Sequence, residues 1–181
     1  IESQVAHRSQ EVCRLLFVGT EWQRKGGDTA VEIARRLNQR GLPTELHVAG
    51  CRPPGELPGF VKLHGFLSKA SPEGRSRLEE LFAQSHFFLL PTRADCTPVV
   101  FPEACSFGLP ILASNVGGIP TVIREGCNGY TFPLAEGPDP YCAAVERLWS
   151  DRADYRRLAL STFQEYAGRL NWEISGHKVA E

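Results

Sequence analysis

Two carboxylates, Asp95 and Glu103, lie close together in the sequence around the start of a predicted helix. Carboxylate oxygens accept hydrogen bonds and repel phosphate oxygens, so this pair is suited to holding hydroxyl groups. Asp95 lies in a loop, where the local backbone gives little reason for an acidic residue. Glu103 lies in the first turns of the helix, where the helix dipole alone also favours a carboxylate. The pair predicts a site for a hydroxyl-bearing ligand, and a purely structural role for Glu103 stays open.

A basic pair, Arg24 and Lys25, precedes two glycines in the loop after the first predicted strand. Lysine supplies a point charge for a phosphate, and arginine supplies a planar fork of donors. Gly26 and Gly27 allow the backbone to approach a ligand closely. The alternative is that Lys25 is an ordinary solvated lysine. The glycines favour the phosphate site.

The helix that begins near Val99 offers unpaired N–H groups and a positive dipole end to an anion. Pro102 cannot donate a hydrogen bond to the carbonyl of Pro98, and it biases Phe101 away from the helical region. We therefore expect the first regular turn to be delayed, with the amides of Val99 to Phe101 free for an anion.

These residues are positioned by apolar runs that alternate with amphipathic segments. Short apolar runs predict six buried strands, namely Cys13–Val18, Thr44–Ala49, Phe60–Leu63, His86–Leu90, Pro110–Ala113 and Tyr130–Phe132. Helical spacing predicts a first helix that is capped by Asp28 and ended by Gly41. It predicts further helices at Glu73–Gln84, Thr97 to Gly108 and Ile119 to Arg124. Beyond Pro140 it predicts several more helices and a tail around Trp172 and Ile174. The alternation predicts an α/β fold, a Rossmann-like doubly wound parallel sheet of about six strands with helices on both faces.

Polar clusters follow the predicted strands in turn. Lys25 follows the first strand, Gly65 the third, Asp95 the fourth, and Gly117 and Gly118 the fifth. Because parallel strands end at the same edge of a sheet, these clusters should meet in one crevice.

Composition excludes several classes of protein. A formal net charge of -1 gives no basic surface for nucleic acid. No apolar run approaches the ~20 residues of a membrane span. The 6 cysteines form no C-x-x-C pair, which predicts reduced thiols and a cytoplasmic, reducing compartment.

The 181 residues fit a single domain. We expect residues 1–12 to be a polar arm or linker remnant and residues 13–181 to form the domain. The chain contains no methionine and begins at Ile1, which predicts a piece of a longer protein or a processed product.

Several familiar sites are absent from the sequence. There is no G-x-G-x-x-G fingerprint, no P-loop and no G-x-S-x-G elbow, which argues against ordinary dinucleotide binding, P-loop hydrolysis and serine hydrolase chemistry. His47, His64 and His86 lie in or at the ends of predicted strands without metal-ligand spacing, so we expect structural histidines and no metal.

From about Cys13 to Trp172 the sequence resembles the C-terminal, donor-binding half of a family 4 glycosyltransferase of GT-B architecture. The motifs that carry the resemblance are FVGTEWQRKGGD, LHVAG, VKLHGFLSK, ADCTPVVFPEACSFGLPILASNVGGIP and EGCNGYTF, in this order. The resemblance implies a retaining transferase that moves a hexose-type sugar from a nucleoside diphosphate sugar without a metal or other cofactor. It also implies that an N-terminal domain completes the active site, and that the isolated piece transfers no sugar.

The resemblance also assigns roles to single residues. Lys25 would hold the pyrophosphate, Glu103 the ribose hydroxyls, and Asp95 the transferred sugar. Main-chain groups would contact the base and the phosphate, and these come from the residues Gly65, Phe66, Leu67, Pro98, Val99 and Val100.

Four positions depart from the family's pattern. Thr20 stands where arginine is usual, so Arg24 is the substitute cation. Asp95 replaces glutamate, Pro98 replaces a common glycine, and Thr121 stands where an acidic residue is frequent.

Three other readings stay open. A nucleotide-sugar epimerase of the same architecture would use similar donor contacts. A non-catalytic nucleotide- or sugar-binding module is the second, although the two carboxylates argue against simple nucleotide binding. A Rossmann oxidoreductase is the third, and it lacks the glycine fingerprint.

Overall fold

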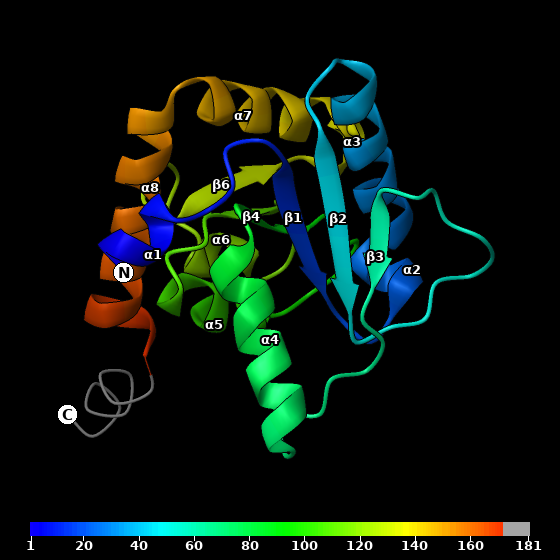
Figure 1. Cartoon of the computed structure of the whole chain (residues 1–181), viewed down its shortest axis with the longest axis horizontal. Coiled ribbons are helices and arrows are strands. Elements are labelled where there is room, and N and C mark those ends of the chain that lie inside the picture. Colours follow the sequence, from blue (N-terminus) through cyan, green and yellow to red (C-terminus); the bar gives the residue numbers. More distant parts are fainter. Residues whose placement is uncertain (172–181) are drawn as a thin grey trace.

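The computed structural model describes residues 1–171, and the predicted tail around Trp172 and Ile174 lies outside them. Six parallel strands form one sheet in the order β3-β2-β1-β4-β5-β6 (Figure 1). Their bounds are β1 Cys13–Val18, β2 Thr44–Ala49, β3 Val61–Leu63, β4 Phe87–Leu90, β5 Ile111–Ser114 and β6 Gly129–Phe132. The predicted doubly wound sheet is confirmed, and each strand boundary agrees with the sequence to within one residue.

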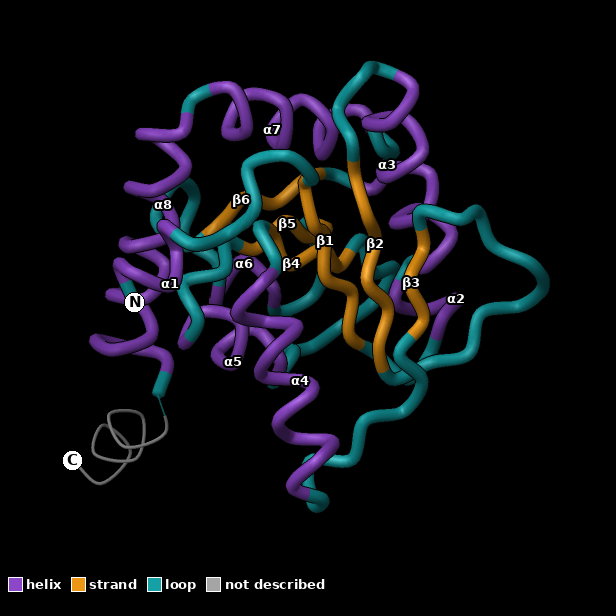
Figure 2. The backbone as a smooth tube through the Cα atoms, viewed as in Figure 1, coloured by secondary structure: helices purple, strands orange, loops and turns teal. Residues whose placement is uncertain are grey.

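Helices cover both faces of the sheet (Figure 2). Their bounds are α1 Glu2–Ala6, α2 Trp22–Lys25, α3 Gly27–Gln39, α4 Pro72–Gln84, α5 Val100–Ser106, α6 Ile119–Val122, α7 Asp139–Ser150 and α8 Arg152–Glu165. A 3₁₀ turn, Leu134–Glu136, follows β6, and a π turn, Tyr166–Leu170, follows α8. Helices α3 and α7 pack against each other, whereas α5 packs against β5 and α8.

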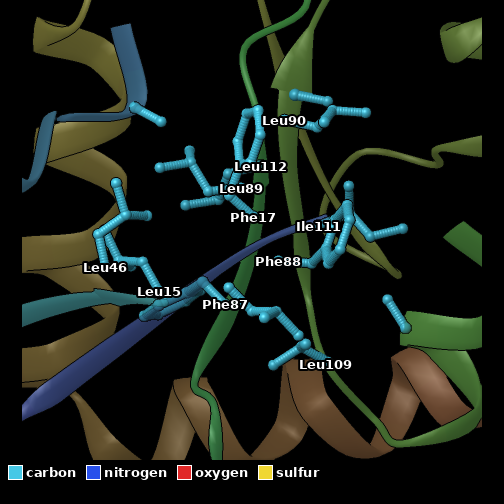
Figure 3. Packing of buried hydrophobic residues seen from close by; sticks show 14 of the residues in the cluster. Leu15, Phe17, Leu46, Phe87, Phe88, Leu89, Leu90, Leu109, Ile111 and Leu112 are labelled. Atoms are coloured by element: carbon cyan, nitrogen blue, oxygen red, sulfur yellow. The ribbon is translucent and has the colours of Figure 1, made fainter. Parts of the chain in front are cut away.

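The core lies between the strands and these helices. Every residue of β4 and β5 is buried, which explains why their sequences are apolar without alternation. Leu15, Phe17, Leu46 and Phe88 are among the packed side chains of the central strands (Figure 3). The ring of Phe88 also meets that of Phe101 edge-on at 5.8 Å, which joins β4 to α5.

The first twelve residues differ from the polar arm that we expected. Residues Glu2–Ala6 form α1, which packs against α8. The Arg8 side chain is only 5% exposed, and it donates hydrogen bonds to the carbonyls of Phe107 at 2.6 Å and Gly108 at 3.0 Å. It also donates to the Tyr155 hydroxyl at 2.8 Å. The carbonyls at the end of α5 supply the negative dipole end that stabilises this buried cation.

The loop after β1 contains a helix that we did not predict. Gly26 has φ +79°, a left-handed conformation in which it both ends α2 and begins α3. Asp28 is not the predicted N-cap, because its carboxylate accepts a hydrogen bond from the Trp22 indole at 2.8 Å.

His86 is fully buried at the start of β4. The Arg14 amide donates to its Nδ1 at 3.0 Å, so Nε2 carries the proton and donates to the Ser9 carbonyl at 2.8 Å. Burial lowers the pKa of His86 from its ordinary 6.5 to about 3. The folded chain therefore keeps this imidazole neutral in mild acid.

This burial predicts a pH-dependent stability. Below about pH 6.5 His86 is protonated in the unfolded chain and stays neutral in the folded chain. The free energy of unfolding should therefore fall by about 1.4 kcal/mol per pH unit as the pH is lowered, until about pH 3. Denaturant titrations between pH 4 and pH 7 should show a shallower slope for His86→Gln than for the parent. The exposed His7 provides a control, His7→Gln. Parallel curves for the parent and His86→Gln would contradict this assignment.

Gly26 allows a second test of the fold. A Cβ atom at Gly26 would lie 1.9 Å from the carbonyl oxygen of Pro91, whereas Gly55 has φ +78° and nothing within 4 Å. The two glycines therefore have nearly the same positive φ and differ in their surroundings. Gly55→Ala should cost about 1–2 kcal/mol through strain alone, and Gly26→Ala should cost a further ~1–3 kcal/mol through overlap. Equal losses in urea unfolding would show that the loop after β1 does not pack against the end of β4.

Candidate functional site

The loops after β1, β3, β4 and β5 meet at the carboxyl edge of the sheet, as the sequence predicts, and the loop after β2 joins them. The Gly50 amide donates to the Gly65 carbonyl at 2.8 Å, which joins the loops after β2 and β3. A Cβ atom at Gly117 would lie 2.0 Å from the carbonyl oxygen of Asp95, so the loop after β5 packs directly on the loop after β4. The glycines therefore bring five loops into one compact edge.

Lys25 and Asp95 form an ion pair at the centre of this edge. Their side chains are only 13% and 10% exposed, so Lys25 is not the freely solvated lysine that the alternative reading assumed. The stem of Lys25 passes close to Gly19, where an added Cβ would lie 3.0 Å from its Cγ. Two residues that we expected to contact adjacent parts of one ligand, the pyrophosphate and the sugar, are thus in direct contact.

Arg24 lies beside this pair. Its guanidinium is 3.6 Å from the Asp95 carboxylate and donates to the Ala94 carbonyl at 2.9 Å. Glu21 accepts a further hydrogen bond from Arg24 at 2.6 Å, which lowers the pKa of Glu21. The end of α2 is held in place because the Thr92 hydroxyl donates to the Arg24 carbonyl at 2.9 Å. A second cation therefore lies next to Lys25, on the residue that we predicted as the substitute for Thr20.

Glu103 lies in the first turn of α5 and forms no hydrogen bond or ion pair with Lys25 or Asp95. Its Oε1 forms an ion pair with Lys69, which follows β3. Its Oε2 is buried and has no hydrogen-bond partner among the described residues. The sequence analysis assigned no role to Lys69 and missed this contact. One sequence feature could have pointed to Lys69, because it follows a predicted strand at the edge of the sheet where the other polar clusters lie.

The start of α5 corrects one expectation. The Phe101 amide is not free, because it donates to the Pro98 carbonyl at 3.0 Å in a tight first turn. The amides of Val99 and Val100 donate to no described residue. Of the three amides predicted to be free for an anion, only those of Val99 and Val100 remain. Pro98 contributes its carbonyl to the first turn of α5.

The loop Gly65–Leu67 leaves β3 at the same edge. Gly65 has φ +66°, and the Phe66 side chain is 76% exposed, whereas Leu67 packs on the core. An exposed phenylalanine beside backbone groups is compatible with a flat ligand, and the predicted base contact of this loop stays a prediction. Thr121 is the fourth position that departs from the family's pattern, and its hydroxyl donates to the Gly118 carbonyl at 2.6 Å.

A cavity of ≈ 540 Å³ lies at the ends of β4, β5 and β6, on the side of α3 and α7. Arg93, Ser114, Leu134 and Tyr141 are among its lining residues. None of the predicted site residues lines it. The cavity nevertheless adjoins the predicted site, because the amide of its lining residue Arg93 donates to the Arg24 carbonyl at 2.8 Å. Lys69 and Glu103 line another cavity, of ≈ 200 Å³.

Other polar groups at the edge have local partners. The rings of His47 and His64 stack at 5.2 Å, and burial lowers the pKa of both imidazoles. Within residues 1–171 no three His, Cys, Asp or Glu side chains gather as a metal site. All six cysteines are unpaired. No helix in this part of the chain has the length and apolar character needed to cross a membrane.

Comparison with known proteins adds an independent finding. The family model described as "Glycosyl transferases group 1" matches residues 12–151. The D-inositol 3-phosphate glycosyltransferase of Nocardiopsis dassonvillei is 28% identical over 171 residues, which cover 87% of this chain and 39% of that protein. The chain therefore spans well under half the length of this curated relative.

Solved structures agree on the fold. The sucrose-phosphate synthase of Thermosynechococcus elongatus superposes with a TM-score of 0.80 at 19% identity, covering 99% of this chain and 47% of that one. HepE of Anabaena, solved in complex with UDP and glucose, gives 0.78 at 16% identity, covering 98% of this chain and 51% of that one. By the family match and the shared sheet, this chain belongs to the group 1 glycosyl transferases, proteins of GT-B architecture.

Proposed function

We propose that this chain is the nucleotide-sugar-binding half of a retaining family 4 glycosyltransferase. In this view it is the C-terminal half, and the complete protein transfers a hexose-type sugar to an acceptor. The observation that carries the proposal is the Lys25–Asp95 ion pair at the carboxyl edge of the sheet, with Arg24 beside it. The Anabaena protein of the same fold was solved with UDP and glucose, which supports this class of ligand.

The ion pair supplies one group for each end of a nucleoside diphosphate sugar. Lys25 is suited to the diphosphate oxygens, and Asp95 is suited to hydroxyls of the attached sugar. On binding, the ligand would exchange one ion pair for two sets of charge-assisted hydrogen bonds. Arg24 can follow Lys25 towards the phosphates because its present hydrogen bonds lie at a partly exposed site.

The same cations explain how the chain would promote transfer. When the bond between the sugar and the diphosphate breaks, negative charge builds up on the leaving phosphate. Once they have turned to the diphosphate, Lys25 and Arg24 would stabilise that charge, which lowers the barrier more than it stabilises the bound substrate. We expect this neutralisation to proceed without a metal. The leaving phosphate would then accept the proton of the acceptor hydroxyl.

Transfer also requires a second wall. The acceptor oxygen must be held about 3–3.5 Å from the sugar carbon, and we expect the loops of this chain to supply one side of the site. We propose that the chain's own N-terminal domain in a longer protein supplies this wall. The 181 residues alone should then bind a nucleoside diphosphate and transfer no sugar. The cytoplasm stays our expected compartment.

The test of the phosphate role is Lys25→Ala. Losing a charged partner typically costs ~1.5–3 kcal/mol, so affinity for a nucleoside diphosphate should fall about 10- to 100-fold while affinity for the nucleoside changes little. Calorimetry with UDP, GDP and ADP and with the matching nucleosides measures both. The exposed Lys62, which only donates to the Gly59 carbonyl at 2.8 Å, provides the control Lys62→Ala.

Thermal melting should accompany these titrations, because Lys25→Ala leaves Asp95 without its main partner. A folded Lys25→Ala variant that loses nucleoside and nucleoside diphosphate affinity equally would remove Lys25 from the phosphate site. An unchanged affinity for both ligands would have the same consequence.

A further inference from the structure

The Glu103 carboxylate is half satisfied in this structure. One oxygen, Oε1, pairs with Lys69, and the other, Oε2, is buried without a hydrogen-bond partner among residues 1–171. A buried acceptor without a donor is costly, and native proteins rarely keep one without a reason. A ligand hydroxyl that donated a hydrogen bond to Oε2 would remove this cost.

Lys69 reaches Glu103 from a backbone that is held firmly. The guanidinium of Arg75 donates to the Lys69 carbonyl from Nε at 3.3 Å and from Nη2 at 3.2 Å. The neighbouring residues Ser68 and Gly74 are also in close contact, because an added Cβ at Gly74 would lie 2.3 Å from the Ser68 carbonyl oxygen. The loop that contains Lys69 therefore packs against the first turn of α4. Ser71 caps that turn by accepting from the Gly74 amide at 3.0 Å.

The resulting ion pair joins two parts of the candidate site. Lys69 belongs to the loop that begins with Gly65 and Phe66, and Glu103 belongs to α5. The Lys69 side chain is 54% exposed, and that of Glu103 is 32% exposed. A pair this exposed adds little to stability, so its position matters more than its strength.

We infer that Lys69 is a positioning residue that orients the Glu103 carboxylate towards a vicinal diol and so sets the preference for ribonucleotides over deoxyribonucleotides. The inference rests on the proposed function, in which Glu103 holds the ribose. Lys69 takes one oxygen and limits how far the carboxylate can turn, and a small turn that uncovers the buried Oε2 offers this oxygen to the ligand as an acceptor.

The experiment compares the affinities of UDP and 2′-deoxy-UDP by calorimetry, or of the corresponding GDP or ADP pair if that base binds more tightly. The proteins are the parent chain, Lys69→Ala, Lys69→Arg, Glu103→Gln and the control Glu73→Gln, which changes an exposed glutamate in the first turn of α4. The parent should prefer the ribonucleotide by about 10-fold or more, as expected for a hydrogen bond to a charged group.

Glu103→Gln should reduce this preference to about 2-fold or less, and Glu73→Gln should retain it in full. Lys69→Ala should lower the preference to about 2- to 3-fold through weaker ribonucleotide binding, with deoxyribonucleotide affinity nearly unchanged. Lys69→Arg keeps the positive charge and should restore most of the preference. Melting curves check that each variant is folded.

The outcomes separate the two levels of the argument. A parent chain without ribonucleotide preference, or a Glu103→Gln variant that keeps it, would overturn the ribose assignment and the inference together. If those two proteins behave as expected and Lys69→Ala retains the full preference, Lys69 forms an ordinary surface ion pair and the inference is wrong. Tighter ribonucleotide binding by Lys69→Ala would show that Lys69 obstructs Glu103, which also overturns it.

Discussion

The parallel direction of all six strands is the constraint on which the candidate site depends. Because every strand ends at the same edge, residues as distant in sequence as Lys25 and Asp95 become neighbours without any long excursion of the chain. The same constraint explains the apolar runs, since a sheet covered on both faces leaves no strand residue for solvent in β4 and β5. Fold and site are therefore consequences of one arrangement.

Close backbone contact turns this convergence into a defined geometry. Gly26 lets the loop after β1 lie against the Pro91 carbonyl, and Gly117 lets the loop after β5 lie against Asp95. With these loops fixed, two lysines from different loops hold two carboxylates. Lys25 pairs with Asp95, and Lys69 pairs with Glu103. The edge thus carries cations and carboxylates in alternation, and this alternation is the basis of the proposed site for a nucleoside diphosphate sugar.

Sequence periodicity predicted the sheet well because each strand is a short apolar run between turn residues. It also predicted that Lys25 and Asp95 share an edge. It could not predict the Lys69–Glu103 pair, which depends on how α4 and α5 lie against each other. Arg8 was missed for a similar reason. A cation in a polar segment is expected at the surface, and only the carbonyls at the end of α5 make its burial possible. Asp28 was wrongly predicted as a helix N-cap. Its partner, Trp22, lies in the short helix α2, which the sequence analysis did not predict because two glycines follow it.

Mapping the backbone amides that respond to UDP by ¹⁵N NMR tests the central claim most directly. The account predicts the largest shift changes along Gly19 to Gly27, in the loop Gly65 to Lys69 and from Asp95 to Val100, with little change near the ≈ 540 Å³ cavity lined by Leu134 and Tyr141. Changes centred on that cavity, with the Lys25 and Asp95 amides unmoved, would contradict the account and place the nucleotide site elsewhere on the domain.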